Sequence, residues 1–92
     1  MMNFESYAEI LKALAHPIRL KIACGLMKKD QCCVSVMVEK LGVAQPTVSQ
    51  HLNILKNAGI IDGYRNGNQI CYRLTNNEVK KIIKAMEIEI CE

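Results

Sequence analysis

The sequence predicts a mainly α-helical domain with one β-hairpin, in the order helix-helix-helix-helix-hairpin-helix. Three observations predict this class. Apolar residues recur every three to four positions through most of the chain, which is the period of amphipathic helices. Prolines stand where two of these helices would begin, and glycines stand where two would end. Between residues 60 and 74 two β-favouring runs flank an Asn-Gly pair, a strong hairpin signal.

Length and composition predict a single aliphatic core. Ninety-two residues suffice for one compact unit, so residues 1–92 are expected to form one domain. Half of the residues are apolar, Trp is absent and Phe occurs once. No apolar stretch approaches the ~20 residues that cross a bilayer, and the N-terminal residues do not resemble a secretory signal. We therefore expect a cytoplasmic protein that does not bind membranes.

The first half of the chain predicts three helices. The first carries apolar residues at helical spacing over residues 4–15. The second is expected over residues 18–27, because Pro17 is well tolerated in a first helical turn. The third follows over residues 34–41 and ends at Gly42, a residue type that suits a helix C-terminus.

The second half predicts a helix, a hairpin and a last helix. The helix is expected over residues 45–58, and the hairpin strands over residues 60–64 and 69–74. Thr75 is expected to cap the last helix, which covers residues 76–92. The inward stripe of the fourth helix is Val48, Leu52 and Leu55, and that of the last helix is Val79, Ile82, Ile83, Met86 and Ile90.

Two short helices joined by residues 41–44 and followed at once by a hairpin describe a winged helix-turn-helix. The second of these helices has two faces of different chemistry. No acidic residue occurs between Gln45 and Ile61, so nothing on this helix would repel phosphates. We therefore predict that its polar face reads the major groove of DNA, although an ordinary solvated face is the simpler alternative. The polar face consists of Thr47, Ser49, Gln50 and Asn53, with His51 on its flank.

The hairpin tip offers a second DNA contact. Arg65, with Asn66 and Asn68 beside it, is placed to reach a phosphate or the minor groove. A plain surface arginine in a turn would look the same. The neighbouring helix favours the DNA interpretation.

Three segments resemble the ArsR/SmtB family of dimeric bacterial repressors, and the similarity extends through Tyr72-Arg73-Leu74. They are Leu14-Ala15-His16-Pro17-Ile18-Arg19-Leu20, Leu41-Gly42-Val43-Ala44-Gln45-Pro46-Thr47-Val48-Ser49-Gln50-His51-Leu52 and Leu55-Lys56-Asn57-Ala58-Gly59-Ile60-Ile61. The resemblance implies a homodimer that binds a pseudo-palindromic operator and releases it when an inducer binds. The family pattern assigns DNA contacts to Gln45, Thr47, Ser49, Gln50 and His51. Ala44 replaces the usual Ser, which removes a helix cap or a phosphate contact.

Dimerisation is also expected from the residues themselves. The first and last helices each carry an apolar stripe that one copy of a 92-residue chain would struggle to cover. In the family that the chain resembles, these helices pair across a two-fold axis. Such an isologous contact would present two recognition helices to the two halves of an operator.

The cysteines indicate a sensor, and two alternatives stay open. Their odd number and the lack of an export signal disfavour a structural disulfide framework. Cys24 and Cys91 are placed like the two cysteines of the persulfide-sensing (SqrR/BigR-type) branch of the family. A disulfide or polysulfide bridge between them, formed by reactive sulfur species, would change the spacing of the recognition helices and release DNA. Either thiol could instead serve only in packing or lie in a frayed terminus.

The other alternative is a metalloid or soft-metal ion held by Cys32 and Cys33. The stretch Cys33-Val34-Ser35 resembles the arsenic-type Cys-Val-Cys site of the family with Ser35 in place of the second thiol. A third ligand would have to come from elsewhere. The zinc site that the family builds on its last helix is not expected, because residues 76–92 contain no His or Asp. Cys71 is interpreted as hairpin packing, and no cofactor is expected.

Enzymatic motifs are missing from the sequence. It contains no nucleophile elbow, no Gly-rich phosphate loop and no Cys-x-x-Cys pair. An enzyme is therefore not expected. A protein-interaction module of the same fold that no longer binds DNA is the remaining alternative to a regulator.

Overall fold

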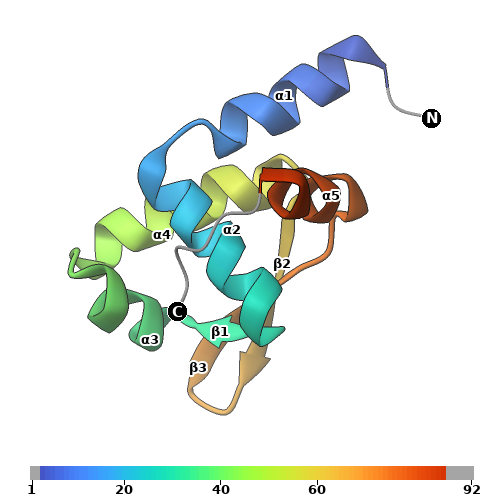
Figure 1. Ribbon diagram of the computed structural model, residues 1–92. Coiled ribbons are helices and arrows are strands. Elements are labelled where there is room, and N and C mark those ends of the chain that lie inside the picture. The colour runs from blue at the N-terminus through green and yellow to red at the C-terminus, as the bar shows by residue number, and fades with distance from the viewer. Residues whose placement is uncertain (1–2, 87–92) are drawn as a thin grey trace.

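The structure, a computed structural model, describes residues 3–86 and has the predicted winged helix-turn-helix fold (Figure 1). Five helices accompany a small antiparallel sheet whose long hairpin projects from the helical body. The helices are α1 (Phe4–Leu14), α2 (Pro17–Lys29), α3 (Val34–Leu41), α4 (Gln45–Asn57) and α5 (Asn77–Met86), and the strands are β1 (Cys32–Cys33), β2 (Ile61–Asn66) and β3 (Gln69–Leu74). Over residues 3–86 no helix combines the length and apolar character needed to cross a bilayer.

The core is aliphatic, as the composition predicts, and it fixes which face of α4 looks outward. The inward stripe of α4 is confirmed: Val48, Leu52 and Leu55 are at most 1% exposed. Side chains from the other four helices and from β2 and β3 join them in one buried cluster. The largest fully buried side chains are Leu26, Leu52, Leu55, Ile60, Ile61, Val48, Val79 and Cys71.

The turn between α3 and α4 follows the prediction. Gly42 adopts a left-handed conformation with φ 68°, and its N–H donates to the carbonyl oxygen of Val38 at 3.0 Å. A residue with a side chain would be strained there, whereas glycine ends α3 without that cost. Two residues later Ala44 precedes α4, so the helix-turn-helix pair is set by backbone geometry that the sequence encodes locally.

The sheet has three strands rather than the predicted two. The strand order is β1-β3-β2, and both pairings are antiparallel. Cys71 on the central strand lies opposite Cys33 on one side and opposite Tyr64 on the other. Strand β1 was not predicted because two residues are too few for an alternating pattern to show.

The hairpin turn is shorter than the predicted connection over residues 65–68, because β2 continues through Asn66. Asn66 pairs with Gln69, so Gly67 and Asn68 form a two-residue turn. Gly67 has φ 66°, whereas neither asparagine has a positive φ. The Asn-Gly signal therefore located the hairpin correctly, but Asn66 closes the ladder instead of occupying the turn.

The cap of α5 is Asn76, and the prediction of Thr75 is wrong. Asn76 immediately precedes the helix, and its side-chain oxygen accepts from the N–H of Val79 at 3.1 Å. Its amide nitrogen donates to the carbonyl oxygen of Gly59 at 3.2 Å. Thr75 is one residue too early, and its backbone N–H is bonded to the carbonyl oxygen of Ile60. Asn76 thus ties the start of α5 to the segment that follows α4.

Candidate nucleic-acid interface

The outer face of α4 consists of neutral polar side chains, as predicted. Because the apolar stripe is buried, residues on the opposite side of the helix point toward solvent. Gln45, Gln50 and Asn53 are exposed, whereas Thr47 and Ser49 are half-buried. Short donors and acceptors of this kind can bond base edges without repelling the phosphate backbone.

The N-terminus of α4 lacks a side-chain cap. Ala44 occupies the capping position, and its side chain forms no cap bond. The first turn of α4 also contains no acidic residue. The opening N–H groups of a helix carry a partial positive charge and favour anions. With alanine at this position instead of serine, no side chain in the described part of the chain compensates the partial positive charge at the start of α4.

His51 faces the helices behind α4. Its Nδ1 atom lies 3.1 Å from Nη1 of Arg19, and its ring lies 4.5 Å from the ring of His16. Because the guanidinium can only donate, Nδ1 accepts and the neutral ring carries its proton on Nε2. A contact with DNA would thus use His51 as a donor. Burial lowers the pKa of His51, and the nearby His16 and Arg19 lower it further.

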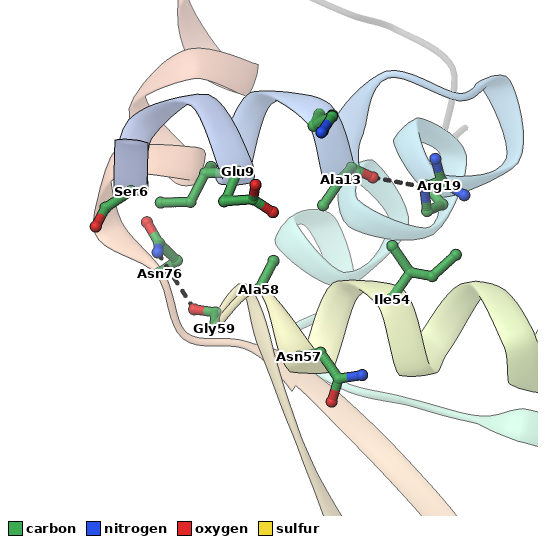
Figure 2. A pocket seen from close by; sticks show the side chains of 11 residues that line it. Ser6, Glu9, Ala13, Arg19, Ile54, Asn57, Ala58, Gly59 and Asn76 are labelled. Atoms are coloured by element: carbon green, nitrogen blue, oxygen red, sulfur yellow. Dashed lines mark hydrogen bonds between the residues drawn. The ribbon is translucent and has the colours of Figure 1, made fainter. Parts of the chain in front are cut away.

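Arg19 is a residue whose role the sequence did not reveal. Its Nε atom donates to the carbonyl oxygen of Ala13 at 2.6 Å, while its other end contacts His51. The side chain lies at one end of a groove of about 790 Å³ between α1 and the C-terminal half of α4, and Asn76 lies toward the other end (Figure 2). Arg19 consequently joins the end of α1 to α4.

The wing carries its polar residues at the far end of the hairpin. Arg65 and Asn66 are exposed at the end of β2, and Asn68 is exposed in the turn. The hairpin base at Ile61 and Leu74 is buried in the core, so the tip projects away from the helices (Figure 1). Nearer the base, the guanidinium of Arg73 lies 4.6 Å from the centre of the Tyr64 ring.

The structure describes only one of the two predicted sensor cysteines. Cys24 is buried in α2, and Cys91 lies outside the described residues, so their distance is not tested. Cys33 is joined by a disulfide to Cys71, with 3.8 Å between their Cα atoms. Cys71 is fully buried, as hairpin packing requires, but its interpretation as packing alone is wrong because its sulfur is bonded.

The adjacent thiols do not converge. Cys32 contacts the core, whereas Cys33 is bonded to Cys71, because successive residues of a strand project to opposite faces. In the part of the chain that the structure describes, no three His, Cys, Asp or Glu side chains gather in a metal-binding arrangement. The sequence offered no signal for the disulfide, whose partners are 38 residues apart.

Comparison with known proteins identifies the family. Residues 16–62 match the family described as bacterial regulatory protein, arsR family. The HTH-type transcriptional repressor SmtB of Mycobacterium tuberculosis is 43% identical over 79 residues, which cover 86% of this chain. The matched region spans 58% of the length of that relative.

The chain also superimposes on solved structures of transcriptional regulators. The transcriptional repressor BigR from Xylella fastidiosa superimposes with a TM-score of 0.82 at 35% identity, covering 96% of this chain and 89% of that one. A homodimeric winged helix-turn-helix DNA-binding domain from Mycobacterium bovis superimposes with a TM-score of 0.81 at 26% identity, covering 90% and 76%. This chain belongs to the arsR family of bacterial regulatory proteins, which are transcriptional regulators and not enzymes.

Proposed function

We propose that the chain is a repressor that binds double-stranded, pseudo-palindromic operator DNA as a homodimer. The observation that carries the proposal is the outer face of α4, which is polar, lacks acidic residues and begins with an uncapped helix N-terminus. Such a face can donate to and accept from base edges, and the helix end attracts phosphate. Gln45, Thr47, Ser49, Gln50 and Asn53 are assigned to this contact, and His51 flanks it.

The wing extends the same interface. Arg65 and Asn66 at its tip are exposed and lie next to no acidic side chain in the sequence. An arginine on a projecting hairpin is suited to a phosphate or minor-groove contact beside a helix in the major groove.

The dimer is supported by an apolar surface on α1. This helix buries one face against the body through Ile10, Ala13 and Leu14. A second face stays open, with Phe4 92% and Leu11 54% exposed. Several large apolar side chains exposed together on one face of a helix are typical of a protein interface. The homodimeric M. bovis domain of the same fold agrees with a two-fold pairing.

Cys24 and Cys91 are proposed as the sensor, and reactive sulfur species are proposed as the inducer that bridges them. Support comes from the positions of the two cysteines, one on α2 and one close to the end of the chain, and from the similarity to BigR. A bridge between them would connect the body that carries α4 to the segment that follows α5, and would change the spacing between the two recognition helices of a dimer.

Metalloid sensing by Cys32 and Cys33 is the weaker alternative. Both thiols would have to face one ion, but they lie on opposite sides of β1 and Cys33 is bonded to Cys71. A metal would require the disulfide to be reduced and the strand to be rebuilt.

The test is a gel-shift assay with the DNA upstream of the protein's own gene. Cys24→Ala and Cys91→Ser should each bind this DNA as the wild type does but should not be released by a sulfane-sulfur donor. Cys32→Ser serves as the matched control and should still be released. Release of both variants would refute the assignment of the sensor, whereas no binding at modest salt would support the protein-interaction module.

A further inference from the structure

The disulfide lies at the joint between the wing and the helix-turn-helix pair. Cys33 is the residue directly before α3, and Cys71 is in the middle of β3. The bond therefore ties the start of α3 to the central strand of the wing. The two residues form one rung of the β1–β3 ladder, which consists of only two residue pairs.

Other contacts also join the start of α3 to the wing. The second rung pairs Cys32 with Tyr72. A hydrogen bond from the hydroxyl of Ser35 to the side-chain oxygen of Gln69 spans 3.3 Å, but it is exposed to solvent. Exposed bonds of this kind contribute little because water competes for both groups. The disulfide adds a covalent link to these contacts and to the packing of α2 and α3 against β3.

The two sulfurs differ in access. Cys71 is fully buried between Cys33 on one side of the sheet rung and Tyr64 on the other, since residues opposite each other in a ladder share a face. Cys33 is half-buried. Because Cys33 is the less buried residue of the two, we expect a small thiol or disulfide from solution to react first at Cys33. This asymmetry gives thiol exchange a defined order.

We propose that Cys33 and Cys71 form a reversible redox site, which low-molecular-weight disulfides oxidise and low-molecular-weight thiols reduce, and whose oxidised form fixes the wing to α3. The effect on DNA rests on the proposed function, whereas the redox chemistry does not. The site is separate from the Cys24 and Cys91 pair and acts in the opposite sense. Oxidation here fixes the wing relative to the helix-turn-helix pair, so that less conformational entropy is lost when the protein binds DNA.

The exchange proceeds in two balanced steps. The thiolate of Cys33 attacks a disulfide RSSR, forms a mixed disulfide and releases one thiolate RS⁻. Cys71 then loses its proton and attacks the Cys33 sulfur, which forms the protein disulfide and releases the second RS⁻. Overall, two protein thiols and RSSR give one protein disulfide and two RSH, and reduction follows the same steps in reverse.

The site is tested first without DNA. The 92-residue chain is equilibrated over a series of oxidised-to-reduced glutathione ratios, quenched with acid, alkylated and digested for mass spectrometry. The expected product is a peptide that links Cys33 to Cys71 and appears as the ratio rises, with Cys32 still alkylated. A Cys33 thiol that stays alkylatable across the whole series would overturn the proposal.

Thermal melting supplies the second measurement. The 38-residue separation predicts that the oxidised protein melts roughly 10 °C or more above the reduced protein. All proteins in this comparison carry Cys91→Ser, which removes the other proposed pair. In that background the gap should persist in Cys32→Ala and vanish in Cys33→Ala and Cys71→Ala. A gap that survives in Cys33→Ala would place the redox site elsewhere.

The link to DNA is measured on Cys91→Ser, which lacks the other proposed pair. The oxidised form should bind upstream duplex several-fold more tightly than the reduced form. Equal affinity in both states would overturn the coupling of the wing to α3. Absence of binding in both states would instead refute the proposed function and leave the redox site to the two preceding measurements.

Discussion

Arg19 and His51 lie 32 residues apart in the sequence, yet Nη1 of the arginine lies 3.1 Å from Nδ1 of the histidine. The same guanidinium donates through Nε to the carbonyl oxygen of Ala13 at the end of α1. This one side chain therefore connects the helix proposed for dimerisation with the helix proposed for DNA recognition. The relative placement of two recognition helices in a dimer would depend on this contact.

The contact predicts a pH dependence of stability. Burial, His16 and Arg19 lower the pKa of His51 in the folded protein, so the neutral ring is favoured by folding. Its contribution is fully present above the unfolded value near 6.5 and is lost as the pH falls through that value toward the lower folded pKa. Protonation turns Nδ1 into a donor that faces the Arg19 guanidinium. The loss should be below about 1 kcal/mol, because solvent screens a half-buried ring.

Urea denaturation between pH 5 and pH 8 measures this effect. His51→Gln should flatten the decline in unfolding free energy below pH 6.5 relative to the wild type. The groups that face His51 are His16 and Arg19, and both remain in the variant. An identical pH dependence of the two proteins would contradict the assigned role of His51.

The cap of α5 can be tested with adjacent residues. Asn76→Ala removes the bond to the Val79 N–H and the bond to the Gly59 carbonyl, and should cost roughly 1–2 kcal/mol of unfolding free energy. Thr75→Ala is the matched control and should change the unfolding free energy by less than about 0.5 kcal/mol. Chemical denaturation measures both, and a larger loss for Thr75→Ala would show that the cap is misassigned.

The open apolar face of α1 predicts a dimer that one charge disrupts. Leu11→Glu places a carboxylate on the exposed stripe with Phe4 and Tyr7, and should shift the protein from dimer to monomer in light scattering after size exclusion. Lys12→Glu introduces the same group one position away, off the stripe, and should leave the dimer intact. Leu11→Glu that remains dimeric would argue against pairing through this face.

The wing tip predicts a change in salt dependence. If Arg65 contacts a phosphate, Arg65→Ala should weaken operator binding for every sequence and reduce the slope of log affinity against log salt by about 1 per protomer. Anisotropy titrations at three salt concentrations measure the slope. An unchanged slope would remove Arg65 from the interface.

The sequence predicted those features that depend on neighbouring residues. The period of Val48, Leu52 and Leu55 identified the buried face of α4, and Gly42 marked the turn before it. The features it did not predict join distant segments. Strand β1 is too short to show a period, and it forms only because β3 pairs with it. The Arg19–His51 contact likewise leaves no local pattern.

The candidate site divides in the same way. The polar character of α4 could be derived from the sequence because one helix carries the whole face. The sensor could not, since cysteine chemistry depends on which thiols meet in space. Cys71 is bonded to Cys33 and not to Cys32 because of the register between β1 and β3. That register is known only once the fold is known.

The central claim is that the outer face of α4 reads operator DNA. Fluorescence anisotropy with a labelled duplex from upstream of the gene tests it, with Asn57→Ala as an exposed control on the same helix. The account predicts saturable binding of two protomers per site, a loss of roughly 5–150-fold in Gln50→Ala, and wild-type affinity in Asn57→Ala. Equal affinity of wild type and Gln50→Ala, or no binding to any duplex at low salt, would contradict it.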